Sequence, residues 1–132
     1  MDKKKLLLIG LLSGSIALPA VAQERPLWLR YPAISPDGKT IAFAYQGDIY
    51  TVPTQGGEAR RLTSTTAYES SPVWSPDSKH IAFTSDRYRT GTNIYIMAAS
   101  GGEARQLTFH SGTEIPQTFT PDGRYLIYKA HL

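Results

Sequence analysis

The chain of 132 residues contains no cysteine, and this absence removes several classes of function at once. Disulfide bonds, thiolate metal sites, a cysteine nucleophile and a lipid anchor on an N-terminal cysteine are all excluded. The chain beyond residue 22 also lacks any block of lysine or arginine, so it has no basic patch that would hold a phosphate backbone. We therefore expect no nucleic-acid partner.

Motifs for catalysis are also missing. The sequence has no Gly-x-Ser-x-Gly nucleophile elbow and no pair of acids placed for acid–base chemistry. His80, His110 and His131 have no partner at metal-ligand spacing. The sequence thus predicts no catalytic residue, no metal site and no cofactor.

The first 22 residues are typical of an export signal. Three lysines at positions 3–5 precede an apolar run of 13 residues, Leu6–Leu18, and Ala20-Val21-Ala22 has the small-x-small pattern of a cleavage site. A membrane anchor is the alternative, but a span needs about 20 apolar residues. We predict cleavage after Ala22, which gives an exported, periplasmic protein with no membrane attachment. Cleavage removes three of 14 basic and one of 11 acidic residues, so the net charge falls from +3 to +1.

An internal repeat organises the rest of the chain. Five short motifs recur in the same order at a spacing of 40 or 45 residues. They are Ser35-Pro36-Asp37-Gly38 with copies at 75–78 and 120–123, Ile41-Ala42-Phe43 with copies at 81–83 and loosely at 126–128, Ile49-Tyr50 with a copy at 94–95, Gly56-Gly57-Glu58-Ala59-Arg60 with a copy at 101–105, and Leu62-Thr63 with a copy at 107–108. Repeats of this length with several short strands each indicate a propeller.

Each repeat contains turn signals between four short segments with β-strand character. The Ser-Pro-Asp-Gly turn precedes a strand at 40–45, Gln46-Gly47 leads into a strand at 48–52, and Gly56-Gly57 leads into a strand at 59–63. The fold class is therefore predicted to be all-β: a β-propeller fragment of WD40-like repeats, with four-stranded antiparallel blades. An immunoglobulin-type sandwich is the rival, but it does not require motifs that recur in register.

The predicted domains are a signal peptide at 1–22 and a partial propeller at 23–132. Blade 1 is expected near 31–63, blade 2 near 72–108, and blade 3 begins near 116–132. About two and a half blades are present, whereas a propeller typically has 4–8. We therefore expect the chain to be part of a longer protein, in which further blades are partners of these.

One segment has no counterpart in the other repeats. The insertion at 86–92 lengthens one hairpin and places Tyr88 between Arg87 and Arg89. These three residues are the candidate contact for an acidic partner or a peptide carboxylate, and a solvated hairpin tip is the alternative. The recurring acids Asp37, Asp77 and Asp122 are assigned to turn formation instead, because each follows a turn proline.

The blade motifs resemble the N-terminal propeller of tricorn-like serine proteases, and the resemblance covers most of residues 27–132. It rests on residues 30–38, 41–43, Gly47-Asp48-Ile49-Tyr50 and Gly56-Gly57-Glu58-Ala59-Arg60-Arg61-Leu62-Thr63. The motif is shared with TolB-type and prolyl-oligopeptidase-type propellers. TolB proteins carry a domain before the propeller, and only about eight residues separate the expected cleavage site from blade 1, too few for a domain.

The resemblance implies a non-catalytic propeller that guides or filters peptide or protein substrates toward a serine-peptidase domain, accompanied by a PDZ-like domain. Neither domain is encoded in these 132 residues, so no catalytic residue is carried over. Two other functions remain open at this stage: a TolB-like periplasmic interaction propeller without enzymatic activity, and an inert remnant. Fold alone does not choose between them.

Overall fold

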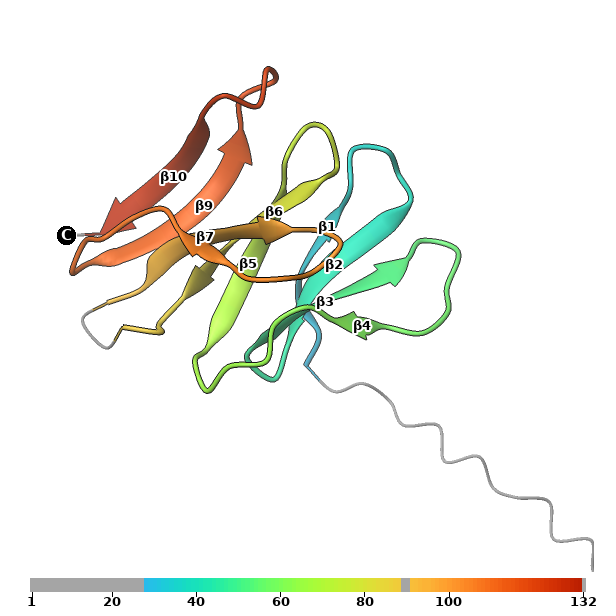
Figure 1. Ribbon diagram of the computed structural model, residues 1–132, viewed down its shortest axis with the longest axis horizontal. Coiled ribbons are helices and arrows are strands. Elements are labelled where there is room, and N and C mark those ends of the chain that lie inside the picture. Colours follow the sequence, from blue (N-terminus) through green and yellow to red (C-terminus); the bar gives the residue numbers. More distant parts are fainter. Residues whose placement is uncertain (1–27, 89–90, 132) are drawn as a thin grey trace, which may run out of the picture.

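The computed structural model describes residues 28–88 and 91–131 (Figure 1). The expected signal peptide and Arg89 therefore lie outside the described residues. Ten strands form three antiparallel sheets of four, four and two strands, which lie side by side in chain order. The described part of the chain contains no helix that is long and apolar enough to cross a bilayer. The predicted fold class, with its four-stranded antiparallel blades, is confirmed.

Each sheet follows the order of the chain. Blade 1 consists of β1 (Arg30–Ile34), β2 (Thr40–Tyr45), β3 (Asp48–Pro53) and β4 (Arg60–Arg61). Blade 2 consists of β5 (Glu69–Trp74), β6 (His80–Ser85), β7 (Asn93–Ala98) and β8 (Arg105–Gln106). Blade 3 consists of β9 (Thr113–Phe119) and β10 (Leu126–His131). The first strands are the inner ones, since β5 packs against both β1 and β9.

The outermost strands are shorter than the predicted span of 59–63. In blade 1 only Arg60 and Arg61 pair with β3. The backbone N–H groups of Leu62 and Thr63 then donate to one carbonyl, that of Ile49, so the regular ladder ends there. The Thr63 hydroxyl accepts a hydrogen bond from the Ile49 N–H at 2.8 Å. A side-chain hydrogen bond thus takes the place of the last backbone hydrogen bond between these strands.

The core lies in the seam between blades 1 and 2. Ala44 and Ile49 of blade 1 pack with Phe83, Tyr95 and Met97 of blade 2, and all five are buried. Small residues on β2 leave room for the aromatic rings of the next blade, as the alternation of small and large residues predicts. The Phe83 and Tyr95 rings stack, with centroids 6.1 Å apart.

The Ser-Pro-Asp turn is held by side-chain hydrogen bonds. The Ser35 hydroxyl donates to Asp37 Oδ1 at 2.5 Å, and the backbone N–H of Lys39 donates to the same oxygen at 3.0 Å. Equivalent pairs of bonds reach Asp77 and Asp122 in the second and third copies. The recurrence of these acids therefore has a structural cause, as expected.

These bonds make the turns sensitive to acid. The hydroxyl, and then the backbone N–H, hold the pKa of Asp37, Asp77 and Asp122 below the ordinary value of 3.8. A carboxyl whose pKa is lower in the folded state stabilises the fold above its unfolded pKa, and this stabilisation is lost as the pH falls through the folded value. We expect the urea midpoint to fall between about pH 5 and about pH 2. The double variant Asp37→Asn/Asp77→Asn should show a smaller fall.

A control variant, Glu58→Gln, removes an exposed carboxylate from the β3–β4 loop. It should keep the wild-type pH dependence. Equal pH profiles for the wild type and the double Asp variant would contradict the assignment of the acid sensitivity to the turns.

Candidate functional site

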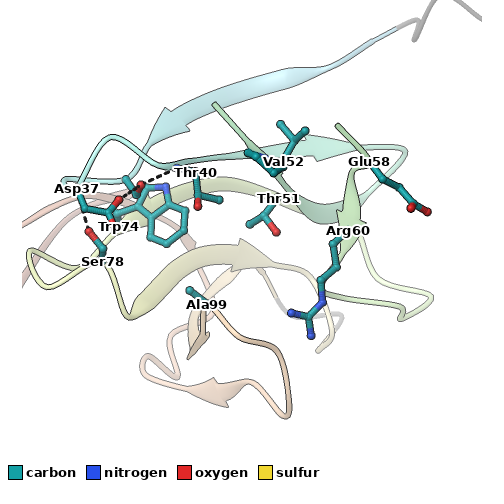
Figure 2. Close-up of a pocket in the computed structure, with 11 residues that line it drawn as sticks. Asp37, Thr40, Thr51, Val52, Glu58, Arg60, Trp74, Ser78 and Ala99 are labelled. Atoms are coloured by element: carbon teal, nitrogen blue, oxygen red, sulfur yellow. Dashed lines mark hydrogen bonds between the residues drawn. The ribbon is translucent and has the colours of Figure 1, made fainter. Parts of the chain in front are cut away.

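A cavity of about 340 Å³ lies in the seam between blades 1 and 2 (Figure 2). Asp37 and Trp74 lie at one end of it, and Arg60 lies at the other. Three side chains link the blades here. The Trp74 indole N–H donates to the Ala33 carbonyl at 2.9 Å, Arg60 Nη2 donates to the Ser100 carbonyl at 2.5 Å, and the Ser78 hydroxyl accepts a bond from the Asp37 N–H at 3.1 Å. The polar groups at this seam therefore hold the blades together.

The next seam contains a related cavity of about 540 Å³ between blades 2 and 3. Its lining includes Asp77, His80 and Phe119, which occupy the positions of Asp37, Thr40 and Trp74 one repeat later. Because a seam cavity recurs with each blade contact, it is a product of blade stacking. A feature specific to this chain is sought instead at the insertion of residues 86–92, which has no counterpart in the other repeats.

The insertion contributes Arg87 to a buried ion pair with Glu69, at the start of β5. Glu69 has no exposed surface, and its Oε1 atom accepts bonds from Arg87 Nε at 2.9 Å and Nη2 at 2.8 Å. The hydroxyls of Thr65 and Ser85 approach the same oxygen at 3.2 and 3.3 Å. The guanidinium also lies 4.7 Å from the centroid of the Tyr95 ring. Arg87 is thus fixed by its own chain through charge, hydrogen bonds and stacking.

The three residues of the predicted contact are placed differently. Arg87 is turned toward Glu69, but it also lines a polar hollow of about 380 Å³ beside Thr65 and Glu103. Tyr88 is 61% exposed at the hairpin, and Arg89 lies outside the described residues.

The insertion that carries these residues is docked against the next blade connection. The Thr92 N–H donates to the Gly112 carbonyl at 3.2 Å, and the Glu114 N–H donates to the Thr92 carbonyl at 3.0 Å. A Cβ atom on Gly91, which has a φ of +145°, would lie 2.4 Å from the Gly112 carbonyl oxygen. The close approach therefore requires glycine at position 91.

A second buried carboxylate occupies the same position one blade later. Glu114 is 4% exposed, and its Oε2 atom accepts a bond from Asn93 Nδ2 at 3.2 Å. Sequence reasoning missed both carboxylates. A signal was present, because Glu69 and Glu114 each lie seven residues before the proline of a Pro-Asp turn.

The family to which the chain belongs is identified by comparing its sequence with models of protein families. Residues 26–131 match the family described as the tricorn protease N-terminal beta propeller domain. The chain belongs to this tricorn N-terminal propeller family. The resemblance to tricorn-like propellers is thereby confirmed.

Relatives of this tricorn-type propeller include peptidases. The chain is 47% identical over 58 residues to the uncharacterized peptidase YuxL of Bacillus subtilis, which covers 40% of the chain and 9% of that protein. It is 36% identical over 62 residues to tricorn protease homolog 1 of Streptomyces coelicolor, covering 47% of the chain and 6% of that protein. The chain therefore spans less than a tenth of the length of these relatives.

A solved structure shares the fold of the tricorn-type propeller. The putative TolB of Agrobacterium tumefaciens superposes with a TM-score of 0.73 at 25% identity, covering 81% of this chain and 40% of that one. The propeller fold of this chain is therefore also that of a TolB protein.

The three histidines of this chain lie on different parts of the fold. His80 begins β6, His131 ends β10, and His110 Nδ1 accepts a bond from the Gly112 N–H at 3.2 Å. Within residues 28–88 and 91–131 no three His, Asp or Glu side chains are grouped to hold a metal ion. The absence of catalytic residues, metals and cofactors stays a prediction.

Proposed function

We propose that this chain is the non-catalytic N-terminal propeller segment of an exported tricorn-like serine peptidase, and that it guides or filters peptides toward a catalytic domain outside these 132 residues. The match of residues 26–131 to the tricorn N-terminal propeller family carries the proposal. The peptidase names of YuxL and of the Streptomyces homologue support it.

The organisation of the chain is part of the same proposal. A signal peptide occupies residues 1–22 and directs export to the periplasm, and a partial propeller occupies 23–132. Its blades lie near 31–63, 72–108 and 116–132, and the remaining blades and the catalytic domain of the parent protein are their partners.

The hydrogen bonds and the burial of the acidic side chains support a structural role for the described residues. The turn carboxylates are bonded within their own turns, and Glu69 is buried against Arg87. A catalytic acid or base must instead reach a substrate atom. We propose that the exposed Tyr88, together with Arg87 and Arg89, which flank it in the sequence, forms a contact for the partner or peptide.

A TolB-like interaction propeller without enzymatic activity is the second candidate. The TM-score of 0.73 with the putative TolB of Agrobacterium tumefaciens favours it. The two functions differ in what accompanies the propeller, because a propeller fold hosts either of them.

The genomic DNA beyond codon 132 distinguishes the two candidates. We expect further blades followed by a serine-peptidase domain, and we expect the complete product to hydrolyse unstructured peptides while the 132-residue chain alone does not. A reading frame that stops after a closed propeller would contradict the peptidase proposal and favour the interaction propeller. Hydrolysis by the purified 132-residue chain, lost on substitution of one of its serines or histidines, would contradict its non-catalytic role.

A further inference from the structure

Exposed aromatic side chains gather at one end of the blades. Antiparallel strands alternate in direction, so the start of each inner strand lies at the same end as the β2–β3 and β6–β7 connections. Trp28 precedes β1 and Tyr68 precedes β5, and their side chains are 73% and 49% exposed. Tyr88 and Phe109 in the later connections are 61% and 79% exposed. Such a concentration of exposed rings marks an interaction surface.

The first two of these rings line a cleft of about 370 Å³. Trp28, Arg30 and Gln46 come from blade 1, and Tyr68 comes from the start of blade 2. A Cβ atom on Gly47 would lie 3.3 Å from Cδ2 of Tyr68, so the glycine lets this ring lie close against the turn. The cleft therefore has aromatic walls and a floor formed by a glycine turn.

The cleft also carries an unneutralised positive charge. The Arg30 guanidinium lies 5.5 Å from the centroid of the Trp28 ring, and neither ion pair found among the described residues includes it. Two carboxylates nearby along the chain do not pair with it: Asp48 Oδ2 pairs with Arg61 at 2.6 Å, and Asp86 accepts a bond from the Tyr68 N–H at 2.6 Å. The charge of Arg30 thus complements a carboxylate on a ligand.

We propose that this cleft binds an extended peptide segment in which a proline is followed by an acidic residue. The proline ring lies against Trp28 and Tyr68, the carboxylate pairs with Arg30, and the Gln46 amide bonds a peptide carbonyl. Extended proline-containing segments suit aromatic-lined grooves because they are preorganised and lose little entropy on binding. The proposal deepens the proposed function by naming a peptide class, but binding itself requires no peptidase domain.

The test uses fluorescence anisotropy with the purified chain and a labelled peptide, acetyl-Gly-Ala-Pro-Pro-Asp-Ala-amide. Two matched peptides replace the aspartate by asparagine or both prolines by glycine. We expect saturable binding of the first peptide, weaker binding of the asparagine peptide, and no measurable binding of the glycine peptide. Trp28→Ala and Tyr68→Ala should each weaken binding about tenfold, as loss of an aromatic anchor does. Arg30→Gln should abolish the preference for aspartate over asparagine.

The matched control is Tyr125→Ala. Tyr125 is 66% exposed and follows the third Pro-Asp turn, at the opposite end of the blades. Its removal should leave the affinity unchanged. Circular dichroism of each variant should show the wild-type β spectrum, because these side chains are largely exposed.

Three outcomes would overturn the proposal: no saturable binding of the first peptide, equal binding of the glycine peptide, or an affinity unaffected by Trp28→Ala and Tyr68→Ala. An equal loss in the Tyr125→Ala variant would also overturn it, by showing that binding is not confined to the cleft. Because the assay uses this chain alone, its failure leaves the peptidase proposal to be decided by the downstream gene sequence.

Discussion

Replacement of Phe83 by alanine is expected to lower the free energy of unfolding by about 3–5 kcal/mol. Phe83 has no exposed surface and packs in one cluster with Ala44 and Ile49 of blade 1 and Tyr95 of its own blade. Its removal leaves a cavity in the seam that joins the two four-stranded blades. Urea unfolding followed by circular dichroism measures the loss.

Phe109 provides the matched control for this substitution. Its ring is 79% exposed in the connection between β8 and β9, so Phe109→Ala should change the free energy of unfolding by no more than about 0.5 kcal/mol. Similar losses in the two variants would show that the blade seam is not the principal core.

The Arg87→Met variant is expected to lose about 3 kcal/mol of stability. Methionine keeps an apolar stem near Tyr95 but leaves Glu69 buried without its positive partner, and breaking a buried pair costs about 3–5 kcal/mol. The lower part of this range applies because the Arg87 side chain is 24% exposed. One carboxylate oxygen, Oε2, already lacks a partner, so the remaining bonds from Thr65 and Ser85 offer little compensation.

The double variant Glu69→Gln/Arg87→Met separates charge burial from packing. It removes the charge together with its partner, so it should be more stable than Arg87→Met alone. Arg124→Met, at an exposed turn residue, serves as the control and should leave the urea midpoint unchanged. A double variant that is less stable than the single one would contradict the buried charge as the source of the loss.

The sequence predicts the parts of this fold whose interactions are local. Ser35 and Asp37 lie two residues apart and bond to each other, so the motif itself contains the geometry of the turn. The strand at 40–45 also follows from alternation alone, and the structure places β2 at the same residues. Because the same motifs recur 40 or 45 residues later, the sequence also predicts where the second blade lies.

Long-range partners are not visible in the sequence in the same way. Arg87 has the appearance of a solvent-facing charge because its counter-ion, Glu69, lies 18 residues earlier in the sequence, at the start of β5. Only the fold brings the start of β5 beside the insertion. The cleft between Trp28 and Tyr68 has the same origin, since two aromatic residues 40 positions apart become neighbours once blade 2 stacks on blade 1.

The two seams use different hydrogen bonds, although the blades are similar in sequence. The first uses the Trp74 indole and the Arg60 side chain as donors to carbonyls. The second uses the Thr84 hydroxyl as a donor to the Glu114 carbonyl and the Asn93 amide as a donor to the Glu114 carboxylate.

Neighbouring repeats of similar sequence are prone to assemble in the wrong order during folding. A blade stacked on the wrong neighbour would leave the buried Thr84 hydroxyl or Glu114 carbonyl unpaired, at about 1–3 kcal/mol for each group, and would lose the more exposed Arg60–Ser100 bond at a smaller cost. The polar partners differ between the two seams. The seams therefore specify which blade follows which, and they penalise misassembled or swapped arrangements that hydrophobic burial alone would tolerate.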